Sequence, residues 1–488
     1  LRIYGIKINT FVNIFSNVSF ITRKYKFIKM QKTITPINNT LYLERPYPTS
    51  LEIEKTIETS SIAFKQWSKT SVLERIEVIN KFIDNLLNLT EEVKKEICWQ
   101  IGRPISQCGS ELRGFEERSR YMVEVAEECL ADVTARKNEE FDNYIFKAPL
   151  GVIFVMAPWN YPIMTATNTI VPALLSGNSI ILKHSSQTPM CAELIFKALQ
   201  GTGIPEGLFQ YIHTDHSTCE KIIADTRIAH VVFTGSVNGG KEIKKYIGQR
   251  FINVGLELGG KDPAYVRSDC DLNHAIENLI DGAFFNSGQS CCGIERIYVD
   301  KSIFQDFVDG AKSLTEKYIL GDPSETNTNL GPVVKISAAN FIRSQVDEAV
   351  SQGASKVVDE TKFNIVSKDN CYIAPQILVN VNHDMRFMTE ETFGPTVGIM
   401  PVESENEAIN LMNDSPYGLT ASIWTKDLDF SKNFGKKIET GTFFMNRCDA
   451  LDPALAWTGV KDTGVGCSLS KLAFDHFTRP QSFHMRKL

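Results

Sequence analysis

The hydrophobic pattern of residues 151–255 alternates between short apolar runs and segments of helical periodicity. The apolar runs lie at 152–156, 179–182, 209–212 and 230–233. They recur at a spacing of roughly 20 to 30 residues, which suits right-handed βαβ units built on a parallel sheet. Because open sheets of this kind bind ligands at the carboxyl ends of their strands, we expect ligand contacts where these runs end.

A second α/β pattern begins at residue 262. Its strand-like segments lie at 264–266 and 296–299, and its helical segments lie at 272–285 and 302–318. The two patterns together predict an α/β protein with two doubly wound domains, each carrying its own sheet.

The region before the first pattern is helical. Apolar residues recur at three- and four-residue spacing in 51–62 and 72–86, with Thr70 or Ser71 as the N-cap of the second helix. A further helix, rich in Glu and Arg, is predicted at 109–129. We expect these helices to pack against the first domain and to take no part in chemistry.

Residues 136–147 are polar and then alternate between apolar and polar positions, which predicts a hairpin that projects from the body. The exposed edge of such a hairpin would favour pairing with another chain.

The composition is that of a soluble globular protein of 488 residues, with 43% hydrophobic and 23% charged residues, and the length suggests two or three domains. A net charge of −6 argues against nucleic-acid binding, and no apolar run is long enough to span a membrane. The 11 cysteines are scattered without a Cys-x-x-Cys pair, and no His-Glu-x-x-His is present. We therefore expect no disulfide framework, no metal and a reducing compartment, the cytoplasm.

Residues 1–32 differ from the rest of the chain, because they hold seven Lys and Arg and no Asp or Glu. Two interpretations stay open. The segment resembles a mitochondrial transit peptide, which would place the protein in the matrix, or it is translated upstream sequence and Met30 is the true start.

Candidate chemistry centres on the stretch FFNSGQSCCG at 284–293. It places two thiols, Cys291 and Cys292, at the end of a predicted helix among glycines and small polar residues. Elsewhere Glu257 stands before a double glycine, and Asn160 lies in a proline-bounded turn. A nucleophile, a base and a polar donor are the minimum for acyl chemistry on a carbonyl. The alternative is that the cysteines are small hydrophobic core residues and that Asn160 only stabilises its turn.

Six motifs carry a resemblance to a known family. They are PWNYP at 158–162, FTGS at 233–236, ELGGK at 257–261, GQSC at 288–291, ETFGP at 391–395 and GVK at 459–461. In this order and at these separations the chain, from about residue 50 onward, resembles the aldehyde dehydrogenase superfamily. The resemblance implies the family's fold, with a cofactor-binding domain and a catalytic domain. It also implies an NAD(P)-dependent oxidation of an aldehyde to a carboxylic acid.

The resemblance implies a role for each chemical residue. Cys291, at the position of the family's nucleophile, would attack the aldehyde to give a thiohemiacetal, with Cys292 as a neighbour only. Asn160 would stabilise the developing alkoxide together with the Cys291 backbone N–H. After hydride transfer, Glu257 would activate the water that hydrolyses the thioester. A salt bridge between Glu257 and Lys261 is the competing interpretation.

The cofactor site has no Gly-x-Gly-x-x-Gly fingerprint. Gly235, Ser236 and Gly239 instead follow a predicted strand and precede a helix around 241–247. Such a helix start suits a pyrophosphate, although a turn of this kind also commonly joins a strand to a helix without binding a ligand.

Other cofactor contacts come from the resemblance. Lys183 corresponds to the adenosine-ribose contact, and Glu391 with Phe393 to the nicotinamide-ribose pair. We add Trp159, which lies in the PWNYP motif. Ser186 stands where many NAD-preferring members have Glu, and since a serine would not repel a 2′-phosphate, we expect NADP to be accepted beside NAD.

The predicted domains are discontinuous. Residues 1–32 form the basic extension, 33–135 and 150–258 the dinucleotide-binding domain, and 259–445 the catalytic domain. Residues 136–149 and 470–488 form a small β element which, by the resemblance, makes the contacts of a homodimer or homotetramer.

The substrate stays open at this point. Succinate semialdehyde is one candidate, and a simple aliphatic or aromatic aldehyde is compatible with Trp159, Phe285 and Trp457 at the entrance. The segment 456–459, AWTG, departs from the family's usual Pro-Phe-Gly-Gly near the expected substrate mouth. Two other classes compete, a thiol esterase that needs no cofactor and a non-catalytic scaffold.

Overall fold

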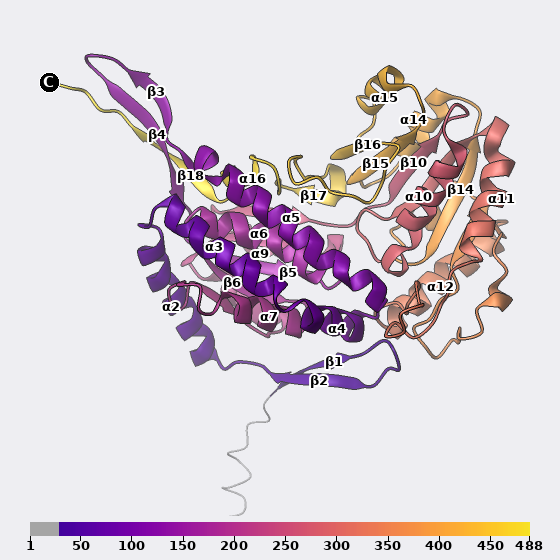
Figure 1. The fold of residues 1–488 in the computed structure, drawn as a ribbon, viewed down its shortest axis with the longest axis horizontal. Coiled ribbons are helices and arrows are strands. Elements are labelled where there is room, and N and C mark those ends of the chain that lie inside the picture. The colour runs from indigo at the N-terminus through magenta and orange to yellow at the C-terminus, as the bar shows by residue number, and fades with distance from the viewer. Residues whose placement is uncertain (1–28) are drawn as a thin grey trace, which may run out of the picture.

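The computed structural model describes residues 29–488, so the predictions for the first 28 residues lie outside it. Figure 1 shows two lobes, one formed mainly by the early part of the chain and one by residues 262–445, with a narrow β element that projects from the first lobe. The prediction of an α/β protein with two sheets is confirmed.

The sheet of the first lobe has the order β17-β9-β8-β5-β6-β7. Its strands are β5 (Val152–Ala157), β6 (Ser179–His184), β7 (Phe209–Tyr211), β8 (Ile228–Thr234), β9 (Asn253–Glu257) and β17 (Gly464–Val465). All neighbours run parallel except the short β17. β5 is buried at every residue, as expected for a strand covered on both faces. The strand order reverses beside β5, which makes the β5/β8 boundary the expected ligand crevice.

Helices cover both faces of this sheet. They are α2 (Ser50–Trp67), α3 (Val72–Leu87), α4 (Thr90–Ile101), α5 (Ile105–Leu130), α6 (Pro162–Leu175), α7 (Pro189–Leu199), α8 (His216–Ala224), α9 (Val237–Ile247) and the short α16 (Ala473–His476). The core of one face draws on α3 to α7, and that of the other face on α8 and α9. Ser71 is the N-cap of α3, where it forms a capping box with Glu74. The helix predicted at 241–247 begins earlier, at Val237, because Ser236 caps it.

The sheet of the second lobe has the order β12-β13-β14-β11-β10-β15-β16. Its strands are β10 (Asp262–Val266), β11 (Ile294–Asp300), β12 (Ser355–Lys356), β13 (Gln376–Val379), β14 (Thr396–Val402), β15 (Thr420–Trp424) and β16 (Thr442–Met445). Its helices are α10 (Leu272–Phe284), α11 (Phe304–Thr315), α12 (Ile336–Ser351), α13 (Arg386–Thr389), α14 (Glu405–Asn413) and α15 (Leu428–Gly435). Separate apolar cores lie on its two faces, so this unit is also doubly wound.

The remaining strands lie outside these sheets. β3 (Val133–Lys137), β4 (Asp142–Pro149) and β18 (Thr478–Phe483) form an antiparallel sheet with β4 in the centre. β1 (Met30–Ile34) and β2 (Leu41–Pro46) form a hairpin. A boundary after residue 32 would therefore divide a strand. Ala473, Phe474 and Phe477 likewise contribute to the core of the first lobe, so the β element begins only at Thr478.

Candidate active site

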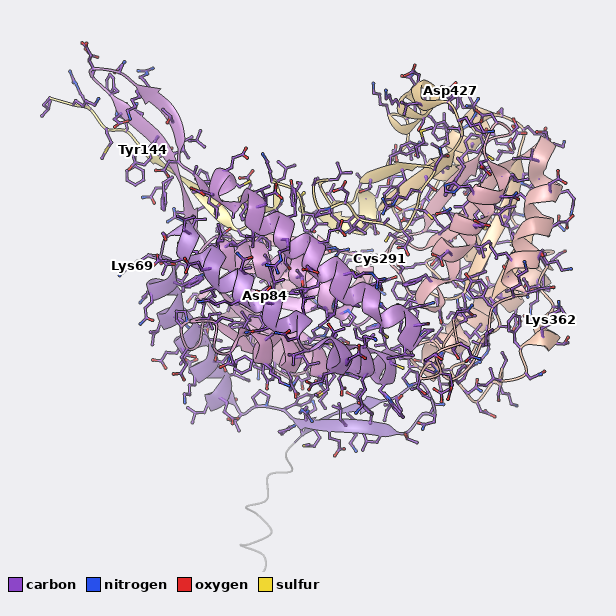
Figure 2. All side chains as sticks on the ribbon, viewed as in Figure 1. Lys69, Asp84, Tyr144, Cys291, Lys362 and Asp427 are labelled. Atoms are coloured by element: carbon purple, nitrogen blue, oxygen red, sulfur yellow. The ribbon has the colours of Figure 1, made fainter. Side chains whose placement is uncertain are left out.

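A cavity of about 1080 Å³ lies between the two lobes, and Asn160, Glu257 and Cys291 all line it. Cys291 lies where the lobes meet (Figure 2). Asn160 follows β5 and Glu257 ends β9, so both stand at carboxyl ends of parallel strands, where a doubly wound sheet binds its ligand. Three residues far apart in the chain thus share one cavity, as the sequence predicts.

The loop after α10 leads into the two adjacent thiols, Cys291 and Cys292, which differ in their exposure. Asn286, Ser287 and Gly288 have consecutive positive φ angles of 52°, 56° and 70°. This left-handed turn, which costs energy for the two non-glycine residues, reverses the chain before the cysteines. Cys291 is partly exposed to the cavity, whereas Cys292 is only 4% exposed.

Cys292 makes its own polar contact. Its Sγ donates to Asp449 Oδ1 at 2.9 Å, and Ser290 Oγ donates to the same oxygen at 3.0 Å. The neighbouring Cys291 thiol and burial raise the pKa of the Cys292 thiol well above its usual range. Cys292 is therefore poorly suited to act as a thiolate nucleophile.

Asn160 is held against the loop that carries Cys291. Its Nδ2 donates to the Gln289 carbonyl at 3.1 Å, and its own carbonyl accepts from Asn286 Nδ2 at 3.2 Å. Arg103 Nη2 donates to the same Asn160 carbonyl. A primary amide has two hydrogens, and among residues 29–488 only one of those on Asn160 Nδ2 has a hydrogen-bond partner, which leaves the other for a ligand in the cavity.

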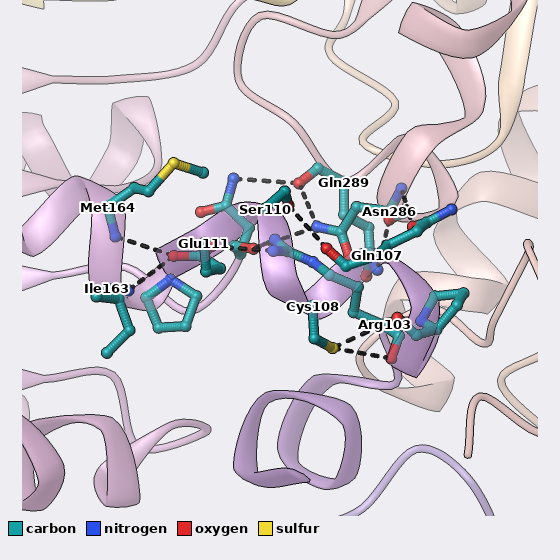
Figure 3. A network of polar contacts seen from close by, with 12 residues as sticks. Arg103, Gln107, Cys108, Ser110, Glu111, Ile163, Met164, Asn286 and Gln289 are labelled. Carbon is teal, nitrogen blue, oxygen red and sulfur yellow. Dashed lines mark hydrogen bonds and ion pairs between the residues drawn. The ribbon is translucent and has the colours of Figure 1, made fainter. Parts of the chain in front are cut away.

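A buried ion pair supports this arrangement (Figure 3). Arg103 Nη1 lies 3.0 Å from Glu111 Oε1, and neither side chain is exposed. The other oxygen of Glu111 accepts from the backbone N–H groups of Ile163 and Met164, in the first turn of α6. A carboxylate at a helix N-terminus is favourable, and here it fixes the start of α6 next to Asn160.

Glu257 is held by hydroxyl groups. Ser468 Oγ donates to Glu257 Oε1 at 2.6 Å, and Thr234 Oγ1 lies 3.5 Å from Oε2. Burial raises the pKa of Glu257 above its ordinary value, which suits a general base. Lys261 pairs with Glu295 at 2.5 Å instead, so the competing interpretation of a Glu257–Lys261 salt bridge is wrong.

Most of the predicted cofactor residues line the same cavity. They are Trp159, Lys183, Gly235, Ser236, Gly239, Glu391 and Phe393. Ser186 does not line it. Its side chain is exposed, its carbonyl accepts from Thr33 Oγ1 at 2.8 Å, and the adjacent Ser185 lines the cavity in its place.

The residues present fit a dinucleotide. Gly235 and Gly239 lie at the N-terminus of α9, and a Cβ on either would come within 2.6 Å of the Phe233 ring, so a side chain at either position would force that ring to move. Lys183 forms no ion pair or side-chain hydrogen bond with residues 29–488, and burial lowers its pKa. An unpaired cation and a helix start with free N–H groups suit the polar groups of a nucleotide.

The structure also places functional residues that the sequence reasoning missed. α5, predicted to serve packing alone, contributes Ser110, Arg113, Glu117 and Arg118 to the cavity wall. One signal was available, since Glu111 and Arg118 are seven residues apart and fall on the buried face of this helix. Ser468 and Asp449 had no comparable signal, because they lie in irregular segments.

Comparison with known proteins settles the family. The model of the aldehyde dehydrogenase family matches residues 24–483. The chain belongs to the aldehyde dehydrogenase family. It is an oxidoreductase that uses NAD or NADP to convert an aldehyde into a carboxylic acid.

Named relatives of this aldehyde dehydrogenase act on several aldehydes. It is 30% identical to the succinate semialdehyde dehydrogenase [NAD(P)+] of Escherichia coli over 438 residues, 90% of this chain and 94% of that one. It is 32% identical to the 3-sulfolactaldehyde dehydrogenase of Priestia megaterium over 438 residues, 88% and 89% of the two chains.

Solved structures agree with the fold. The succinic semialdehyde dehydrogenase of Streptococcus pyogenes in complex with NADP+ matches with a TM-score of 0.89 at 26% identity, over 93% of this chain and 100% of that one. The betaine aldehyde dehydrogenase of Staphylococcus aureus in complex with NAD+ matches with a TM-score of 0.88 at 27% identity, over 93% and 91%.

Within residues 29–488 of this aldehyde dehydrogenase, no helix combines the length and the apolar character that crossing a membrane requires. The same residues hold no group of three or more His, Cys, Asp or Glu side chains placed to bind a metal ion.

Proposed function

We propose that Cys291 is the nucleophile of this aldehyde dehydrogenase, Asn160 its oxyanion donor and Glu257 its general base. The carrying observation is that the three residues, from three separate segments of the chain, line one cavity together with the cofactor candidates. Cys292 is buried whereas Cys291 is partly exposed, which supports Cys291 as the nucleophile.

In the first step the Cys291 thiolate attacks the aldehyde carbon, and a C–S bond forms as the C=O π pair moves to oxygen. The free N–H of Asn160 and the backbone N–H of Cys291 donate to that oxygen, where a missing donor typically costs about 2.7–4 kcal/mol. A dinucleotide bound in the cavity would accept hydride from this carbon, the electron pair on oxygen would re-form the C=O bond, and a thioester would remain on Cys291.

In the second step Glu257 takes a proton from water, and the water oxygen attacks the thioester carbon. The C–S bond then breaks, which releases the carboxylic acid and restores Cys291. Because burial raises the pKa of Glu257, its carboxylate is a stronger base than an exposed one.

For the cofactor, we propose that the start of α9 with Gly235, Ser236 and Gly239 holds the pyrophosphate. Lys183 holds the adenosine ribose, and Glu391, Phe393 and Trp159 surround the nicotinamide end. The T-shaped contact between Trp159 and Phe393, with ring centroids 5.6 Å apart, supports a shared aromatic wall there.

The test compares the two adjacent thiols. We expect Cys291→Ser to abolish formation of reduced cofactor with a panel of short, acidic and aromatic aldehydes, and Cys292→Ser to retain most of it. Unchanged activity of Cys291→Ser would refute the mechanism. Hydrolysis of an activated ester, measured with and without dinucleotide, separates the cofactor-independent thiol esterase from this proposal.

Succinate semialdehyde is a candidate substrate, because several relatives are named for it.

A second proposal concerns assembly. We propose a homodimer or homotetramer assembled through β18, β4 and β3. Val133 on edge strand β3 is 48% exposed and Phe146 on β4 is 37% exposed, and light scattering on the purified protein tests the assembly.

We further propose that the protein works in a reducing compartment, the cytoplasm or the mitochondrial matrix. All 11 cysteines are free. Fractionation of cells that express the protein tests this assignment.

A further inference from the structure

Arg118 is a buried cation on the wall of the active-site cavity. It lies on α5 and is 8% exposed, yet it lines the same cavity as Cys291. Its Nη1 donates to Asn168 Oδ1 at 3.0 Å and to the Met164 carbonyl at 3.4 Å. In the described part of the chain no carboxylate lies within 4.0 Å of its guanidinium.

The two carboxylates that act on Arg118 most strongly are already engaged. Glu111 uses one oxygen for Arg103 and the other for two backbone N–H groups of α6. Glu257 is bound by Ser468 and Thr234. Burial lowers the pKa of Arg118, but a guanidinium stays protonated at neutral pH, so its charge is not neutralised.

An uncompensated buried charge is costly unless a ligand shares the site. The Nε and Nη2 atoms of Arg118 make no hydrogen bond with residues 29–488, and neither is sealed from solvent. Both therefore remain available to a molecule in the cavity, and together they form the flat fork that binds an oxyanion with two parallel hydrogen bonds.

We propose that Arg118 binds an anionic group, a carboxylate or a sulfonate, at the end of the substrate remote from the aldehyde. This inference rests on the proposed function, because it places the aldehyde at Cys291. It makes Arg118 the residue that selects short aldehydes carrying an oxyanion over neutral aldehydes of the same length.

The other explanation of Arg118 is that it acts through Glu257, since its charge lowers the pKa of that base. The two explanations differ in their effects. A residue that acts on Glu257 changes kcat and its pH profile alike for every aldehyde. A residue that binds the substrate's anion changes kcat/KM for anionic aldehydes alone.

The experiment uses 4-oxobutanoate, its neutral methyl ester and a short sulfonated aldehyde with the full-length enzyme and its preferred dinucleotide. Arg118→Met removes the charge with little change in volume. Asn168→Asp places a carboxylate where an amide now accepts from Arg118, so it neutralises the cation without removing it. Arg120→Met is the matched control. It makes the same substitution at an exposed arginine two residues further along α5.

We expect the wild-type enzyme to prefer 4-oxobutanoate over its methyl ester by about tenfold or more in kcat/KM, the worth of a charge-assisted hydrogen bond. Both Arg118→Met and Asn168→Asp should reduce this preference by about 10- to 100-fold, mainly through KM, while the ester loses less than about threefold. Arg120→Met should leave the preference unchanged. The sulfonated aldehyde, compared with 4-oxobutanoate, shows which of the two oxyanions the site prefers.

An equal loss for the anionic and neutral aldehydes in both variants would overturn the inference, as would a wild-type enzyme that prefers the ester. If Arg118→Met does not fold, the wild-type preference and Asn168→Asp still decide. A wild-type enzyme that oxidises no aldehyde would instead contradict the proposed function. Oxidation of neutral aldehydes without any anion preference would contradict the role of Arg118 alone.

Discussion

Ser468 donates a hydrogen bond to Glu257 at 2.6 Å, across 211 residues of chain. This bond stabilises the ionised form of the carboxylate and so opposes the effect of burial, which raises the pKa of Glu257. The pH range in which this base can work is therefore set by a hydroxyl group from the C-terminal part of the chain.

Replacing Ser468 by Ala should move the acid limb of the kcat profile to higher pH. Glu257 must be ionised to accept a proton from water, and without the hydrogen bond its pKa rises further, so a larger fraction is protonated at a given pH. On the acid limb we expect kcat to fall by about tenfold. The measurement is kcat as a function of pH, from about pH 5 to about pH 9, and it shows the position of the acid limb in both enzymes.

Thr234→Val is the matched control, because Thr234 lies 3.5 Å from the other oxygen of Glu257 and binds it weakly. It should shift the acid limb less than Ser468→Ala does. An acid limb that stays in place in Ser468→Ala would show that Glu257 does not limit turnover there.

The buried pair of Arg103 and Glu111 should stabilise the fold far more than a surface pair. Glu111→Gln leaves the Arg103 charge buried without a carboxylate, and we expect a loss of about 3–5 kcal/mol in the free energy of unfolding. Asp84→Asn breaks the exposed pair with Arg120 and should cost less than about 1 kcal/mol. Chemical denaturation of the two variants in parallel measures the difference.

Glu111→Gln should also lower kcat, because Arg103 and the start of α6 both fix Asn160. If the variant lost stability but kept the wild-type kcat, the pair would serve folding alone.

The strands β5 to β8, β10 and β11 could be predicted because parallel strands covered on both faces are continuous apolar runs, as in β5. Cys291, Asn160 and Glu257 could be found because each stands in a short local motif. Arg118 was harder to find, since a charged residue within a helix rich in Glu and Arg looks like part of a solvated face. Its burial depends on the packing of α5 against α6, which local sequence does not show.

Ser468 and Asp449 could not be found for a different reason. Both act through partners more than 150 residues away in the chain, and nothing in the neighbouring residues marks them. Ser186 shows the opposite case. Its position in the sequence suggested a cofactor contact, but the structure turns its neighbour Ser185 toward the cavity.

Use of NADP can be tested at this position. Ser186 itself does not line the cavity, but its neighbour Ser185 does, so the longer side chain of a glutamate at 186 would bring a carboxylate to that edge and repel a 2′-phosphate. Ser186→Glu should then lower kcat/KM for NADP by about tenfold or more and change that for NAD by less than about threefold. Ser186→Gln has the same size without the charge and should leave the ratio of the two cofactors unchanged. Steady-state kinetics with both dinucleotides measures the effect, and equal losses for NAD and NADP in Ser186→Glu would exclude Ser186 from cofactor selection.

Asp449 should make the binding of anionic aldehydes depend on pH. Its carboxyl group lines the cavity, and burial raises its pKa to about 6. Below this pH the group is neutral, whereas above it the charge repels an anion that Arg118 attracts. The KM for 4-oxobutanoate should therefore rise between about pH 5 and pH 7, while the KM for its methyl ester stays level.

Asp449→Asn keeps an oxygen that can accept from Ser290 and Cys292, and it should hold the KM for the anion at its low-pH value throughout. If the KM for the methyl ester rose in parallel in the wild-type enzyme, charge repulsion by Asp449 would not be the cause.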